Sequence, residues 1–103
     1  MELLLTHGYF LEKDEHERRV MKPYPPLGIL YLSAYLKSKG MDVTVFDSTF
    51  RSMEDFTGFL KEHRPSTIGI YCNLMTKLNV LAMIRLCKSM GSTVLLGGPE
   101  PSS

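Results

Sequence analysis

Residues 27–46 read LGILYLSAYLKSKGMDVTVF, and this stretch decides the fold class. Its first part has apolar residues at helical spacing and predicts a helix from Leu27 to Lys39. The face that we expect to be buried comprises Ile29, Leu32, Ser33 and Leu36. Gly40 is a residue that can end the helix in a left-handed conformation. The run 43–46 is nearly continuous in apolar and β-branched residues, which predicts a strand covered on both faces.

The same alternation of helix and strand extends over the rest of the chain. Further apolar runs predict strands at 3–5, 68–71 and 93–96, and helical periodicity predicts helices at about 53–63 and 78–90. A β-α-β-α-β-α-β order with right-handed crossovers favours a parallel sheet between helices. We therefore expect a flavodoxin-like (Rossmann-like) three-layer α/β/α fold with strand order 2-1-3-4.

Local signals support the last two helices. Ser52 with Asp55 three residues later resembles a capping box, and Pro65 ends the helix that follows. Gly91 closes the last helix. The inward face that we predict for it comprises Val80, Leu81, Ile84 and Cys87.

The last predicted strand is fully apolar over Val94-Leu95-Leu96, and only GGPEPSS follows it. An apolar strand at a sheet edge would be unprotected, so a further strand and helix, or a partner domain, are expected to cover it. We therefore expect residues 1–103 to be one domain, without the final strand and helix of the fold, at the N-terminus of a larger protein.

Composition excludes several classes of protein. The 103 residues carry a net charge of +1, which argues against a nucleic-acid-binding surface. No apolar run approaches the ~20 residues that a membrane span needs. Cys72 and Cys87 have no metal-type spacing, so a cytoplasmic, reducing location is the default expectation.

Ligands of open parallel sheets bind beyond the carboxyl ends of the strands. The segments predicted there are His7-Gly8, Asp47-Ser48, Cys72-Asn73-Leu74 and Gly97-Gly98-Pro99. Each has a simpler alternative: the glycines and His7 as turn residues, Asp47 and Ser48 as the start of a turn, and Cys72 as a small buried hydrophobic residue.

The stretch PPLGILYLSAYL (residues 25–36) resembles the first helix of cobalamin-binding domains in radical SAM enzymes. Those of the anaerobic magnesium-protoporphyrin ester cyclase type and their methyltransferase relatives are the most similar. The resemblance continues through residues 40–43, 46–47, 64–65 and 68–70 and ends at VLLGGP, residues 94–99. It adds Pro25, Pro26, Leu27 and Gly28 to the cofactor-binding candidates.

Better-known cobalamin-binding domains carry Asp-x-His-x-x-Gly, then Ser-x-Leu, then Gly-Gly, and the histidine is the lower axial ligand of cobalt. Gly97-Gly98 matches the third motif, and Cys72 stands in place of the serine in the second. If Gly28 is the glycine of the first motif, Pro23 and Pro25 replace its aspartate and histidine. Proline cannot ligate cobalt, so the resemblance implies base-off binding without a histidine ligand. His16 in Asp14-Glu15-His16 is the alternative ligand, or a solvated loop residue.

The resemblance implies a module that presents cobalamin to a C-terminal radical SAM domain with a [4Fe-4S] cluster and S-adenosylmethionine. The chain has no Cys-x-x-x-Cys-x-x-Cys and no nucleophile–base–orienter set, so we expect neither catalytic residues nor a protein metal site in it. The alternative is a cobalamin-free scaffold or interaction domain. A phosphoacceptor receiver or a flavodoxin is disfavoured, because the acidic cluster and the hydroxyl-rich phosphate loop that they need are missing.

Overall fold

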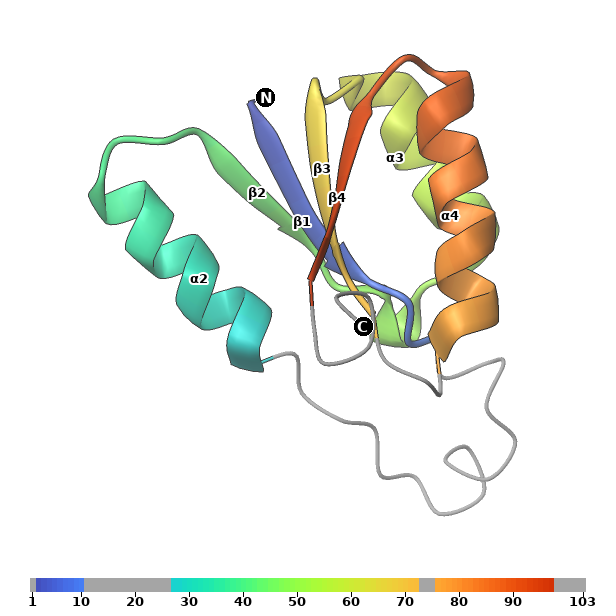
Figure 1. The fold of residues 1–103 in the computed structure, drawn as a ribbon, viewed down its shortest axis with the longest axis horizontal. Helices are drawn as coiled ribbons and strands as arrows, with labels where there is room; N and C mark the ends of the chain where they lie inside the picture. Colours follow the sequence, from blue (N-terminus) through green and yellow to red (C-terminus); the bar gives the residue numbers. More distant parts are fainter. Residues whose placement is uncertain (1, 11–26, 73–75, 98–103) are drawn as a thin grey trace.

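Four parallel strands form one sheet, in the order β2-β1-β3-β4 (Figure 1). The computed structural model describes residues 2–10, 27–72 and 76–97. The strands are β1 (Leu3–His7), β2 (Val43–Phe46), β3 (Thr67–Tyr71) and β4 (Thr93–Gly97). This arrangement confirms the predicted α/β class, the flavodoxin-like sheet and the 2-1-3-4 order.

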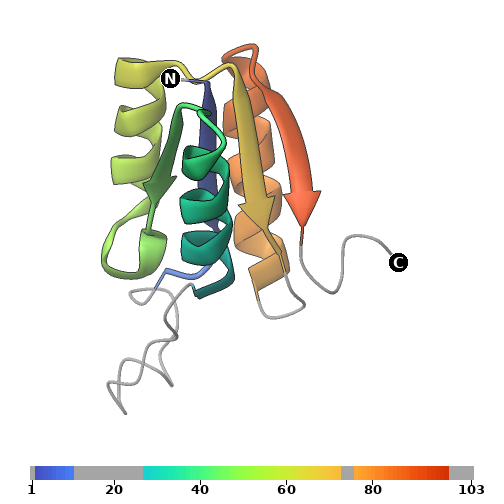
Figure 2. The same cartoon turned by 90° about the vertical axis from the view of Figure 1, so that its left-hand side faces the viewer.

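Helices cover the two faces of the sheet unequally. One face carries α2 (Leu27–Ser38), while α3 (Met53–His63) and α4 (Lys77–Ser89) pack on the other, as Figures 1 and 2 show. A short 3-10 helix, η2 (Ser48–Phe50), follows β2 directly. Within the described residues, no helix is long and apolar enough to cross a membrane.

The predicted helix ends are confirmed, with shifts of one residue. After α2, Gly40 has φ +86°, and after α4, Gly91 has φ +80°, a region that favours glycine. The Ser52 hydroxyl accepts from Asp55 N at 3.0 Å, and the Asp55 carboxylate accepts from Ser52 N at 2.9 Å. These two bonds form the capping box that begins α3.

The core consists of two separate clusters, one on each side of the sheet. The larger one joins the sheet to α3 and α4, and its fully buried members include Leu4, Ile68, Phe56 and Met83. The smaller one joins the sheet to α2 through Leu5, Val43 and Ile29. Successive residues of β1 therefore belong to different clusters, as expected of a strand buried on both faces.

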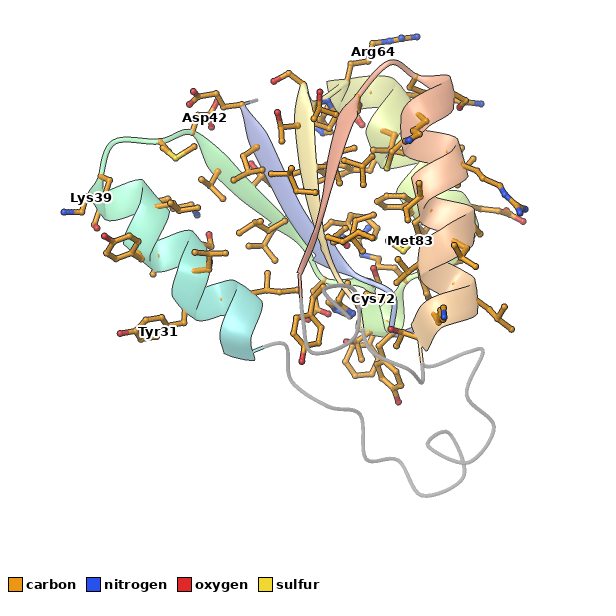
Figure 3. The ribbon with its side chains drawn as sticks, in the orientation of Figure 1. Tyr31, Lys39, Asp42, Arg64, Cys72 and Met83 are labelled. Carbon is orange, nitrogen blue, oxygen red and sulfur yellow. The ribbon has the colours of Figure 1, made fainter. Side chains whose placement is uncertain are left out.

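Two predicted core positions are wrong. Leu32 and Leu81 are exposed, while Met83, which the prediction omitted, is fully buried against the sheet (Figure 3). Leu81 lies about 100° around the helix from Val80, outside the inward face that Val80 and Met83 define. Leu32 belongs to a helix that covers only part of its sheet face, so nothing in the described chain buries it.

Candidate functional site

The carboxyl ends of the strands bring together residues that are far apart in the chain. In β1, Thr6 pairs with Phe46 of β2 and His7 pairs with Tyr71 of β3. Asp47, the first residue after β2, therefore reaches His7 across the edge of the sheet. Figure 3 shows Cys72 at this same edge, with Arg64 at the opposite edge.

His7 is 5% exposed and is held through both ring nitrogens. Its Nε2 lies 2.8 Å from Asp47 Oδ1, and its Nδ1 accepts from Tyr9 N at 3.1 Å. An ionised Asp47 needs a donor, and Tyr9 N–H needs an acceptor. A neutral imidazole with its proton on Nε2 satisfies both. Ser48 N lies 3.2 Å from the same Nε2 and is directed at it, and it can donate there only in the tautomer whose Nε2 carries no proton.

The carboxylate of Asp47 caps the start of η2 with one oxygen, Oδ1, and leaves its second oxygen, Oδ2, without a hydrogen bond in the described chain. Its Oδ1 accepts from His7, from Thr49 N at 3.1 Å and from the Thr49 hydroxyl at 2.7 Å. Burial alone would raise the pKa of Asp47, but the hydrogen bonds from His7 and Thr49 outweigh it and lower the pKa below its ordinary value of 3.8. The side chain is 47% exposed, and in the described chain all three bonds converge on Oδ1. Oδ2 therefore remains for an external donor.

Ser48 has a positioning role in this structure. It is fully buried, and its hydroxyl donates to the His7 carbonyl at 2.9 Å. The Thr6 hydroxyl, 3.2 Å away, donates to the Phe46 carbonyl at 2.7 Å. These bonds tie the ends of β1 and β2 together, and direct contact between Ser48 and a cofactor stays a prediction.

Gly8 is explained by packing. A Cβ there would lie 2.5 Å from Val80 Cγ2 and 3.2 Å from both Cβ and the carbonyl oxygen of Thr76. Asn79 Nδ2 donates to the Gly8 carbonyl at 3.0 Å. The segment after β1 thus lies directly against the start of α4, and a cofactor contact at Gly8 stays a prediction.

Gly28 and Gly97 have no such explanation. Among the described residues, a Cβ at either position would meet nothing within 4 Å, and neither residue has a positive φ. Gly58 shares these properties but lies within α3, away from the carboxyl edge. Gly28 at the start of α2 and Gly97 at the end of β4 therefore leave accessible backbone at the edge where ligands of this fold bind.

Cys72 lies in the larger core cluster and is not in a disulfide. Its backbone N donates to the Gly97 carbonyl at 2.8 Å, so it extends the pairing of β3 with β4. This environment supports the alternative of a small buried hydrophobic residue. Thr6, Thr49 and Asn79 also hold the site; Thr49 belongs to the predicted strand-end segment 47–49, whereas no sequence motif singled out Thr6 or Asn79.

Several predicted site residues lie outside the described part of the chain. They are Pro25, Pro26, Asn73, Leu74, Gly98 and Pro99, together with Pro23 and His16, on which the axial-ligand question depends. Leu27 is the first residue of α2, and its side chain lies outside the described part of the chain.

The comparisons with known proteins agree with this geometry. The family model for the B12 binding domain matches residues 18–103, which include α2, β2, β3, β4 and the residues that follow each strand. Comparison with curated proteins and with solved structures gave no significant match. The chain belongs to the B12-binding domain family, and it is a cobalamin-binding domain of flavodoxin-like fold.

Proposed function

We propose that the chain binds cobalamin base-off, without a histidine below the cobalt, and presents it to a C-terminal radical SAM domain. The observation that carries this proposal is the carboxyl edge of the sheet. There, Asp47 Oδ2 is left for a donor, and Gly28 and Gly97 leave space above the backbone. The amide side chains of a corrin are donors of the kind that Asp47 would accept.

The two described histidines, His7 and His63, are not placed to ligate cobalt. His7 is buried, with both ring nitrogens engaged, so ligation would require the loss of its bond to Asp47 or to Tyr9. His63 ends α3 beside Arg64, at the edge opposite the proposed site (Figure 3). His16 is the remaining histidine.

The resemblance of residues 25–36 and 94–99 to radical SAM relatives supports the choice of partner. In that setting cobalamin supplies methyl transfer or radical chemistry, and a second domain supplies the [4Fe-4S] cluster and S-adenosylmethionine. The role of residues 1–103 is then to bind and orient the cofactor. The two cysteines form no disulfide, which supports a reducing, cytoplasmic location.

Reconstitution with hydroxocobalamin tests the proposal. After desalting, we expect retained corrin absorbance with a base-off spectrum that is unchanged by His16→Ala. Reduction to cob(II)alamin followed by electron paramagnetic resonance gives a second readout, because an axial nitrogen splits each cobalt line. Uniform ¹⁵N labelling of the protein alters that splitting only when the nitrogen comes from the protein. A splitting that labelling alters, or a spectral shift in His16→Ala, would overturn the ligand-free assignment.

Two variants test the edge itself. Gly97→Val fills the open space at the end of β4, and Asp47→Ala removes the free acceptor, so both should weaken retention of cobalamin. Gly58→Val is the matched control, because its Cβ also meets nothing but lies within α3. Failure of the folded chain to retain cobalamin would favour the scaffold alternative. Equal retention by all variants would place the cofactor elsewhere.

A further inference from the structure

The carboxylate of Asp47 is held in a fixed orientation by the protein. Its Oδ1 has three donors around it: His7 Nε2 at 2.8 Å, Thr49 N at 3.1 Å and the Thr49 hydroxyl at 2.7 Å. Hydrogen bonds to an ionised acceptor are among the strong ones, and turning the carboxylate would break all three. One oxygen therefore stays bound to the protein, and the other is presented at the carboxyl edge of the sheet.

Asp47 lies on the side of the sheet formed by β2. It directly follows this strand, and β1 and β3 separate β2 from β4. The side chain of Asp47 is 47% exposed, whereas that of His7 beside it is 6% exposed. A carboxylate that is half open to solvent and anchored on a buried partner is a preorganised acceptor, which loses little conformational freedom when a ligand binds.

The pair formed by His7 and Asp47 carries one negative charge. Burial raises the pKa of Asp47, but the hydrogen bonds from His7 and Thr49 outweigh it and lower the pKa below 3.8, so the carboxylate is ionised at neutral pH. Within the described chain, the one basic group within 4 Å of it is the imidazole of His7. The Nδ1 of that ring accepts from Tyr9 N at 3.1 Å, as a neutral imidazole does. The charge of Asp47 is therefore not neutralised by His7.

A fixed, negatively charged acceptor selects a neutral donor. A primary amide offers an N–H to Oδ2 and carries no charge. A carboxylate has no proton to donate and would place a second negative charge beside the first, which is a strong means of rejecting a ligand. We propose that Asp47 distinguishes a propionamide side chain of the corrin from the propionate that its hydrolysis leaves. The inference rests on the proposed function, and it makes Asp47 a specificity-determining residue of that site.

Asp47→Asn should remove this selectivity, because the surrounding donors determine how the new amide is oriented. The three donors around Oδ1 require an acceptor, so the carbonyl oxygen of the asparagine takes that place. Its NH2 group then takes the place of Oδ2. A propionate can accept from this group, and a propionamide can turn its own carbonyl oxygen toward it. The variant should therefore bind both forms of the corrin side chain.

Equilibrium dialysis at neutral pH compares hydroxocobalamin with its separated isomers in which a single propionamide has been hydrolysed to propionate. We expect at least one isomer to bind the wild-type chain about tenfold or more weakly than hydroxocobalamin. The methyl ester of that isomer is neutral but cannot donate, so its affinity should be intermediate. In Asp47→Asn the ratio for the same isomer should fall toward one. Asp42→Asn is the matched control, because Asp42 precedes β2 at the opposite edge of the sheet (Figure 3) and its loss should leave the ratio unchanged.

The ratio of affinities is a readout that a merely structural role of Asp47 would not move, and circular dichroism establishes that each variant is folded. Equal affinity of the wild-type chain for hydroxocobalamin and for every isomer would overturn the inference and leave the proposed function intact. A ratio that Asp47→Asn leaves unchanged would also overturn it, because another residue would then distinguish the two side chains. Failure of the folded wild-type chain to bind hydroxocobalamin at all would overturn the inference together with the proposed function.

Discussion

Gly8→Ala is the substitution whose effect the structure determines most directly. The new Cβ would lie 2.5 Å from Val80 Cγ2, and Val80 is buried, so one of the two must move by about 1 Å to reach ordinary contact. Overpacking of this kind costs about 1–3 kcal/mol. Removing a glycine restricts the unfolded chain and returns about 0.4–1 kcal/mol. The net expectation is a loss of about 1–2 kcal/mol, which lowers Tm by roughly 5–15 °C for a domain of this size.

Thermal and urea unfolding, followed by circular dichroism, measure this loss. Gly58→Ala is the control of opposite sign, since its Cβ meets nothing and alanine favours a helix by about 1 kcal/mol. Val80→Ala removes the atom that clashes. The double variant Gly8→Ala/Val80→Ala should therefore be more stable than the sum of the single effects predicts. A Gly8→Ala protein as stable as wild type, or strict additivity in the cycle, would refute the packing explanation.

Three further predictions concern α3, α4 and the site. Ser52→Ala should destabilise the domain by about 1 kcal/mol in urea unfolding, while Ser52→Asp, which can still cap α3, should not. Burial raises the pKa of the Cys87 thiol from 9.0 to about 11, so the folded state keeps a proton that the unfolded state loses. Stability should therefore fall between pH 9 and pH 11, by on the order of 1 kcal/mol per pH unit, and Cys87→Ala should remove that slope. The lowered pKa of Asp47 predicts stability that is present above pH 3.8 and lost as pH falls further. When the free energy of unfolding is measured as a function of pH in acid, Asp47→Asn should not show the loss of stability that Asp47 causes below pH 3.8.

The fold was predictable because several independent local signals agreed. Periodicity located the helices, and Ser52 with Asp55 and the glycines at 40 and 91 fixed where helices begin and end. Leu32 and Leu81 were assigned to the core because periodicity does not specify how wide the buried face of a helix is. That width depends on how much of the sheet a helix covers, which is a property of the tertiary structure.

The sequence predicted where the candidate residues lie, at the carboxyl edge of the sheet, but few of the contacts that they make there. Knowing that parallel strands end at one edge was enough to bring His7 and Asp47 together. Their hydrogen bond, 40 residues apart in the chain, depends on the register of β1 with β2, which no local pattern encodes. Gly8 illustrates the converse: a glycine after a strand suggested space for a ligand, and the structure fills that space with Val80.

The division of the core into two unequal clusters has a consequence for local opening. Helix α2 is anchored through the smaller cluster alone, chiefly by Ile29 against Leu5 and Val43. The larger cluster can persist when that anchor is lost, so α2 should detach as a separate cooperative unit below the free energy of global unfolding. Amide protons of α2 should then exchange with solvent sooner than those of α3 and α4. Helix α2, which begins near Gly28, would then open and close locally, while the part of the domain packed around Phe56 and Met83 stays folded.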